Sequence, residues 1–114
     1  MGTVKESQHA YQVELLTALR NELINREIIA VLITDSKNRP CLDVTDSAFR
    51  PRRVYAHLAF QWYYWGAEHD ERVSCLKLFP AADRIAEAAR AGWRDGEQEE
   101  LGLDLSQIRQ AYRS

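Results

Sequence analysis

The feature that most constrains the fold is an uncharged run at residues 54–65, VYAHLAFQWYYW. It contains neither glycine nor proline, and its many aromatic side chains favour an extended backbone. Because no turn signal interrupts the run, we expect one long strand, the alternative being two shorter strands joined by a bulge near Ala59. In a single strand, the side that carries Phe60 and Trp62 is almost entirely apolar, so we expect these two rings in the core.

The opposite side of this predicted strand mixes aromatic rings with hydrogen-bonding tips. It carries Tyr55, His57, Tyr63 and Trp65. Such side chains bury a large area while keeping a polar contact, which is typical of interfaces. The first helix covers them, or they form an exposed patch for a partner or ligand. We therefore take these four residues as a candidate interaction surface.

The segments before this run predict a helix and a hairpin. Residues 4–26 carry leucines at every fourth position, as an amphipathic helix does. Residues 28–34 read IIAVLIT, a continuous apolar run typical of a central strand that is covered on both faces. Residues 40–45 read PCLDVT and follow a polar turn, so we expect them to pair with the preceding strand as an antiparallel hairpin.

A second helix is predicted at residues 80–91, because proline stands in its first turn and Gly92 follows as a C-terminal cap. Its alanine-rich face can approach a sheet closely, and the large rings of residues 54–65 would fill the remaining space. The fold class is therefore α+β: an N-terminal helix, an antiparallel meander of three or four strands, a second helix and a short C-terminal helix. Residues 1–93 form a single domain.

Residues 94–114 are expected to form an acidic tail that ends in the short terminal helix. The apolar stripe of that helix carries Leu105, Ile108 and Tyr112. A helix of this length is marginal alone in water, so it needs a surface on its own domain or on another chain. We therefore expect residues 101–112 to take part in association.

Composition and charge exclude several functions. The net charge of −2 gives no general attraction to phosphate backbones, so a nucleic-acid partner is not expected. No apolar run approaches the length of a membrane span, and the first residues do not resemble a signal peptide, so we expect a cytoplasmic protein. Cys41 and Cys75 fit buried free thiols in a reducing compartment. The preference for arginine over lysine is typical of a bacterial coding sequence.

Catalytic, cofactor and metal motifs are not evident in the sequence, so we expect no cofactor and no metal, and we favour a non-enzymatic function. His69, Asp70 and Glu71 are adjacent and cannot easily converge on one metal ion. An enzyme built around His57 and Asp43 would require these two groups to meet in a pocket.

Three arginines, Arg50, Arg52 and Arg53, form a small basic cluster just before the aromatic run. They are candidate anion contacts, with the aromatic residues beside them as a stacking platform. The alternative is that they solvate a loop around Pro51 and protect the end of a strand, and the net acidity of the chain favours this alternative.

The order of these segments resembles a group of short, uncharacterised bacterial helix–sheet–helix proteins. The resemblance covers residues 15–91 and rests on IIAVLIT, PCLDVT, a tryptophan-rich strand ending in QWYYWG, and AADRIAEAAR. It implies the order of the elements and a core position for Trp62. It implies no activity and no catalytic residue, because none is established for such proteins.

The sequence as a whole favours a protein–protein interaction module, homodimeric and acting as a regulatory or accessory protein. Its contact surfaces would be the candidate interaction surface and residues 101–112. The alternative is a small-ligand or nucleotide binder whose stacking wall and anion contacts are Tyr55, His57, Tyr63, Trp65, Arg52 and Arg53.

Overall fold

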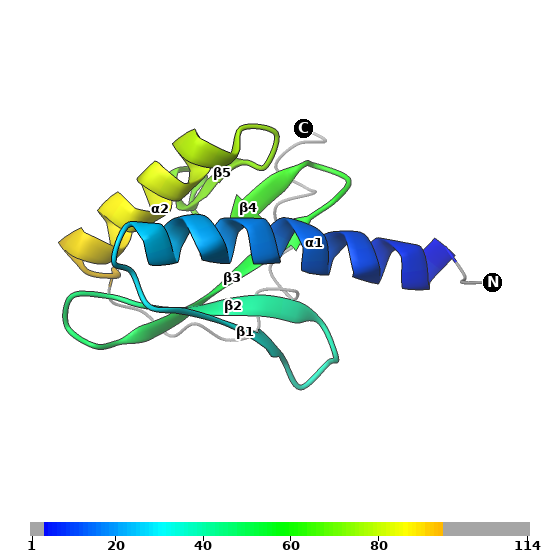
Figure 1. Cartoon of the computed structure of the whole chain (residues 1–114), viewed down its shortest axis with the longest axis horizontal. Helices are drawn as coiled ribbons and strands as arrows, with labels where there is room; N and C mark the ends of the chain where they lie inside the picture. The colour runs from blue at the N-terminus through cyan, green and yellow to red at the C-terminus, as the bar shows by residue number, and fades with distance from the viewer. Residues whose placement is uncertain (1–3, 95–114) are drawn as a thin grey trace.

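The structure is a computed structural model that describes residues 4–94. Two helices cover one face of a five-stranded antiparallel sheet (Figure 1). The elements are α1 (Val4–Asn25), β1 (Ala30–Thr34), β2 (Pro40–Thr45), β3 (Pro51–His57), β4 (Trp62–Tyr64), the 3-10 turn η1 (His69–Glu71), β5 (Arg72–Ser74) and α2 (Leu78–Ala91). The strand order β1-β2-β3-β4-β5 is a simple meander. The predicted α+β class is confirmed, with one strand more than expected, and the predicted terminal helix lies outside the described residues.

The helix α1 packs on the sheet through a short leucine stripe. Leu16, Leu19 and Leu23 are fully buried, and their spacing places them on one side of the helix. Tyr11, one turn earlier along the predicted stripe, is half exposed. The first turns of α1 extend beyond the strands (Figure 1), so it is the second half of the helix that contributes to the core.

The helix α2 contributes a thin, closely packed face. Its fully buried side chains are Ala81, Ala82, Ile85, Ala86 and Ala89. They belong to the same core cluster as the large rings of Tyr63 and Trp65 on the sheet, as expected for alanines opposite aromatic residues. The helix ends at Ala91, and the next residue, Gly92, has a φ of 94°, which lies in the region that glycine adopts without strain.

Residues 54–65 form two strands, so the prediction of one long strand is wrong. The strand β3 ends at His57, β4 begins at Trp62, and the four residues between them form a tight turn. Gln61 takes a φ of 56°, and the Phe60 N–H donates to the His57 imidazole at 3.2 Å. Gln61 thus takes the left-handed backbone conformation that glycine or asparagine usually takes in a turn. For this reason the amino-acid composition of residues 58–61 does not reveal the turn.

This turn also reverses which rings face the helices. Ala56 pairs with Tyr63 across β3 and β4, so Tyr63 and Trp65 share the side of the buried Ala56. Tyr63 and Trp65 are 1% and 2% exposed in the main core. Phe60 and Trp62 are only partly buried and lie outside that core. The expectation that Phe60 and Trp62 point into the core is therefore wrong.

The strand β1 lies at an edge of the sheet, whereas its apolar sequence predicts a central strand. Among the described residues only β2 pairs with it. Ala30 and Leu32 lie on the helix-covered side, while Val31 points to the other side and is 53% exposed. Ile29, just before the strand, is 59% exposed. The sequence predicts that both faces of β1 are covered, but residues 4–94 cover only the face that carries Ala30 and Leu32.

The two hairpin turns that precede β2 and β3 share one motif. Residues 34–40 read TDSKNRP, and residues 45–51 read TDSAFRP. In each turn the aspartate, Asp35 or Asp46, accepts main-chain N–H groups two and four residues later at 2.8 to 2.9 Å. The residue before the arginine has a φ of 63° in the first turn and 61° in the second. The same hydrogen-bonded structure is therefore used twice.

The second turn also anchors the end of α2. The Asp46 carboxylate accepts the Trp93 main-chain N–H at 2.9 Å. The Trp93 ring N–H donates to the carbonyl oxygens of Val44 and Arg50 at 3.2 and 3.1 Å. Burial alone would raise the pKa of the Asp46 carboxyl, but its main-chain N–H donors outweigh burial and lower this pKa from 3.8 to about 2.

We expect Asp46→Asn to destabilise the fold and to reduce its sensitivity to acid. Because the pKa in the folded state is about 2, below the ordinary 3.8, the charged carboxylate stabilises the fold above about pH 4. This contribution is lost as the pH falls toward about 2. An amide has only one acceptor oxygen for these donors, so the melting temperature near neutral pH should fall by roughly 5–10 °C.

Thermal denaturation monitored by circular dichroism between neutral pH and about pH 2 measures both effects. The control is Glu87→Gln, which removes an exposed carboxylate from α2. Equal melting temperatures and equal acid sensitivity in the two variants would contradict the role given to Asp46.

Candidate functional site

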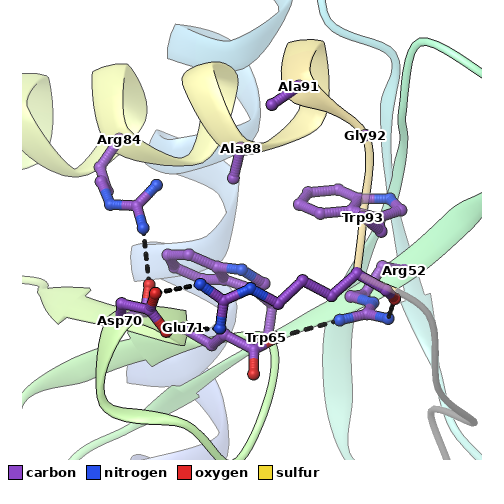
Figure 2. Close-up of a pocket in the computed structure, with 10 residues that line it drawn as sticks. Arg52, Trp65, Asp70, Glu71, Arg84, Ala88, Ala91, Gly92 and Trp93 are labelled. Atoms are coloured by element: carbon purple, nitrogen blue, oxygen red, sulfur yellow. Dashed lines mark hydrogen bonds and ion pairs between the residues drawn. The ribbon is translucent and has the colours of Figure 1, made fainter.

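A pocket opens between the C-terminal half of α2 and the η1 turn (Figure 2). Its volume is about 140 Å³. We call it the arginine–tryptophan pocket, because its charged and aromatic lining consists of Arg52, Arg84, Arg94, Asp70, Glu71, Trp65 and Trp93. These residues come from β3, the position after β4, η1, α2 and the segment that follows α2, so the meander and the second helix together create the pocket.

Two indole rings form walls of the pocket, and both are held in place. Trp65 follows β4 directly, and its main-chain N–H donates to the Glu71 carbonyl oxygen at 2.9 Å. Trp93 is fixed by its bonds to the β2–β3 turn and is almost fully buried. Because both residues are buried and their main-chain N–H groups are hydrogen-bonded, the cavity exists before any ligand arrives.

A buried ion pair lies beneath these rings. The Arg52 guanidinium donates to the Glu71 carboxylate at 3.0 Å, and each side chain is 10% exposed. Arg52 also donates to the carbonyl oxygen of Arg94 at 2.7 Å, and its guanidinium carbon is 5.8 Å from the centre of the Trp93 ring. Arg52 thus ties the segment after α2 to the sheet, and its charge is already neutralised by Glu71.

The mouth of the pocket is more exposed and is organised around Asp70. Arg94 donates to both carboxylate oxygens of Asp70, one of them at 2.8 Å, and lowers the pKa of this carboxyl. Arg84 donates to the Asp70 carbonyl oxygen at 2.8 Å and lies over the Trp65 ring at 5.7 Å. Figure 2 shows Arg84 reaching from α2 toward Asp70. Three guanidinium groups thus face two carboxylates, which leaves one positive charge in excess.

The three arginines predicted as anion contacts do not converge on one site. Only Arg52 lines the arginine–tryptophan pocket. Arg50 belongs to the β2–β3 turn, where it binds Asp46 and donates to the Trp93 carbonyl oxygen at 2.6 Å. Arg53 lies on the side of β3 that faces away from the helices, because neighbouring residues of a strand point to opposite faces.

The candidate interaction surface is also divided between the two sides of the sheet. Tyr63 and Trp65 lie in the core beneath the helices, and Tyr55 is buried on the opposite side. Of the four, only His57 is partly exposed. The four residues therefore do not share one face, as both alternatives for this surface assume, because the turn after β3 changes the alternation. The other predicted contacts, Leu105, Ile108 and Tyr112, lie outside the described residues.

A different aromatic group occupies the side of the sheet away from the helices, which we call the outer face. The rings of His57, Phe60 and Trp62 stack in a row, with centre-to-centre distances of 4.6 and 4.8 Å. The Arg72 guanidinium carbon lies 4.3 Å from the centre of the Trp62 ring. This row begins at the turn that the sequence does not reveal, so Phe60 and Trp62 were assigned to the wrong side.

The structure bears on three sequence-based questions: a metal site, the His57–Asp43 pair and the reactivity of the cysteines. His, Cys, Asp and Glu side chains there form no group of three that could hold a metal ion. Asp43 pairs with Arg53 across the sheet, about 13 Å along β3 from His57, so these two predicted catalytic groups do not meet. Burial raises the pKa of the Cys41 and Cys75 thiols, which disfavours the reactive thiolate.

Neither helix of the described part of the chain combines the length and apolar character needed to span a membrane. No family model, curated protein or solved structure matches this chain. Its function must therefore be argued from its own geometry.

We expect Gly66→Ala to destabilise the protein by about 2 kcal/mol. A β-carbon at Gly66 would lie 2.3 Å from the carboxyl group of Glu71, which would have to move and weaken its pair with Arg52. In a Glu71→Ala background the clash is absent, so the added cost of Gly66→Ala should largely disappear. Urea denaturation of the two single variants and the double variant measures this coupling. Additive costs would show that Glu71 is not what requires glycine at this position.

Proposed function

We propose that this chain is a non-enzymatic protein–protein interaction module, a homodimeric regulatory or accessory protein whose two copies join along β1. One observation carries the proposal: an uncharged, apolar strand, Ala30–Thr34, lies at the edge of the sheet. Native proteins usually protect such edges with charged residues, proline or a bulge, because an open edge pairs readily with another chain. The strand β1 contains none of these.

The main-chain hydrogen bonds of β1 indicate how a second copy would pair. The Thr45 N–H donates to the Ile29 carbonyl oxygen at 3.0 Å. Because bonding direction alternates along an antiparallel strand, the N–H and C=O groups of Ala30, Leu32 and Thr34 then point away from β2, toward the edge. The outward-pointing N–H and C=O groups thus recur at every second residue, which is the spacing that an antiparallel partner strand requires.

Pairing about a two-fold axis satisfies these groups with those of an identical strand. With Leu32 opposite its own copy, Ala30 pairs with Thr34 of the second copy, and the two sheets become continuous. On the outer face, Val31 then lies opposite Ile33 of the second copy, which buries apolar side chains that one copy leaves partly exposed. The strand β1 becomes a central strand, as its sequence predicts.

We expect Val31→Lys to weaken dimerisation at least about tenfold, because it places an ammonium group opposite an apolar side chain near the two-fold axis. The control is Ser74→Lys, which introduces the same charge on the exposed outer face of β5, at the other edge of the sheet. Light scattering coupled to size exclusion, over a range of protein concentrations, measures the mass of each variant.

The expected result is a dimer for the unmodified chain and for Ser74→Lys, and a monomer for Val31→Lys at the same concentrations. Circular dichroism and thermal melting confirm that each variant is folded. A monomeric unmodified chain, or a folded Val31→Lys variant that remains as dimeric as the control, would refute pairing along β1.

A further inference from the structure

The arginine–tryptophan pocket contains a guanidinium group, that of Arg84, which forms no ion pair with the side chains of residues 4–94. Among the described residues, Arg84 donates only to the main-chain carbonyl oxygen of Asp70, which carries no net charge. Its neighbours Arg52 and Arg94 each have a carboxylate, on Glu71 and Asp70 respectively. We infer that this pocket binds a small oxyanion, a phosphate or carboxylate group, between Arg84 and Arg94.

The contacts of Asp70 indicate where the oxyanion binds. Its carboxylate accepts two hydrogen bonds from Arg94, which is the geometry in which arginine binds carboxylates and phosphates. The Asp70 and Arg94 side chains are 50% and 57% exposed, so a ligand can reach this pair from solvent. An incoming oxyanion replaces the Asp70 carboxylate on Arg94 and also accepts a hydrogen bond from Arg84. Asp70 is thus an internal competitor that occupies the site when no ligand is bound.

The walls favour a small ligand over a large one. A volume of about 140 Å³ is close to that of a cavity which holds a single benzene molecule, roughly 150 Å³. The rings of Trp65 and Trp93 exclude water on two sides, and an ionic contact is stronger where water is excluded. Both rings are already buried, and the Trp93 ring N–H is hydrogen-bonded as well, so the pocket does not have to be ordered by its ligand.

The three tryptophans make binding directly observable. Trp65 and Trp93 line the pocket, whereas Trp62 lies on the outer face beneath Arg72. We would titrate inorganic phosphate, acetate and benzoate separately into ¹⁵N-labelled protein at constant ionic strength, and follow the indole N–H signals by NMR. The expected result is a saturable shift of the Trp65 and Trp93 signals with phosphate or with a carboxylate, while the Trp62 signal stays in place.

Two variants with matched controls identify the residues responsible. Arg84→Gln should weaken binding about tenfold or more, since a charged hydrogen-bond donor is lost. Arg90→Gln is its control, because Arg90 is an exposed arginine of α2 that also donates to a main-chain carbonyl oxygen. Asp70→Asn should tighten binding several-fold by removing the competitor, whereas Glu87→Gln, with the same change of net charge, should not.

The inference is overturned if none of the three anions gives saturable shifts at millimolar concentrations. It is also overturned if the Trp62 signal follows the same concentration dependence, or if Arg84→Gln and Arg90→Gln behave alike. The pocket is formed within one copy of the chain and is lined by no residue of β1. Binding should therefore persist in Val31→Lys, so this inference and the proposed dimer can fail independently.

Discussion

The carboxylate of Asp46 is the constraint on which the rest of the structure depends. It accepts the main-chain N–H groups of Ala48, Arg50 and Trp93, and the Arg50 side chain as well. The same turn satisfies the end of α2, because the Ser47 N–H donates to the Ala89 carbonyl oxygen at 3.0 Å. Without this turn, the end of α2 would lose these hydrogen bonds to the sheet, and the Trp93 ring would be held less firmly as a wall of the pocket.

The related turn at Asp35 shows how one local structure serves two purposes. Its carboxylate accepts the hydroxyl of Tyr55 at 2.8 Å, at the oxygen that corresponds to the one bound to Trp93 in the second turn. Each turn therefore fixes an aromatic residue as well as reversing the chain. The first holds a ring on the outer face, and the second holds one beside α2. In both turns burial alone would raise the pKa of the carboxyl, but the hydrogen bonds outweigh burial and lower this pKa, so the carboxylate stays charged and accepts several hydrogen bonds.

The helices and β2 could be predicted from the sequence because their signals are local. The leucine spacing of α1, the alternation in PCLDVT and the glycine after α2 each depend on a few neighbouring residues. The turn between β3 and β4 has no such signal, since Gln61 adopts its left-handed conformation without glycine or asparagine nearby. A single undetected turn was enough to exchange the roles of Trp62 and Trp65, because alternation has a period of two.

The candidate site was predictable only in part, for a related reason. Arg52 and Trp65 stood out in the sequence, one in a basic cluster and one in an aromatic run. Their partners Arg84 and Arg94 reach the same pocket through the packing of α2 on the sheet and through contacts of the segment after α2, which a sequence pattern does not show. The repeated T-D-S-x-x-R-P motif is visible in the sequence, but its spacing has the period of neither a helix nor a strand. Its role as an aspartate-centred hairpin turn becomes evident only from the hydrogen bonds that it makes.

Two features of this molecule differ from the rest of the structure in how apolar surface is buried and how charge is paired. Most buried polar groups are paired, and helices close the core. Within residues 4–94, however, β1 is an apolar edge and Arg84 forms no ion pair with a carboxylate. Folded proteins tend to show such differences where they bind something. In a single copy, β1 exposes apolar surface, and the Arg84 guanidinium has no carboxylate within residues 4–94 to pair with. Pairing through β1 would bury that surface and an oxyanion would pair with that guanidinium, so binding at each would stabilise the fold that forms it.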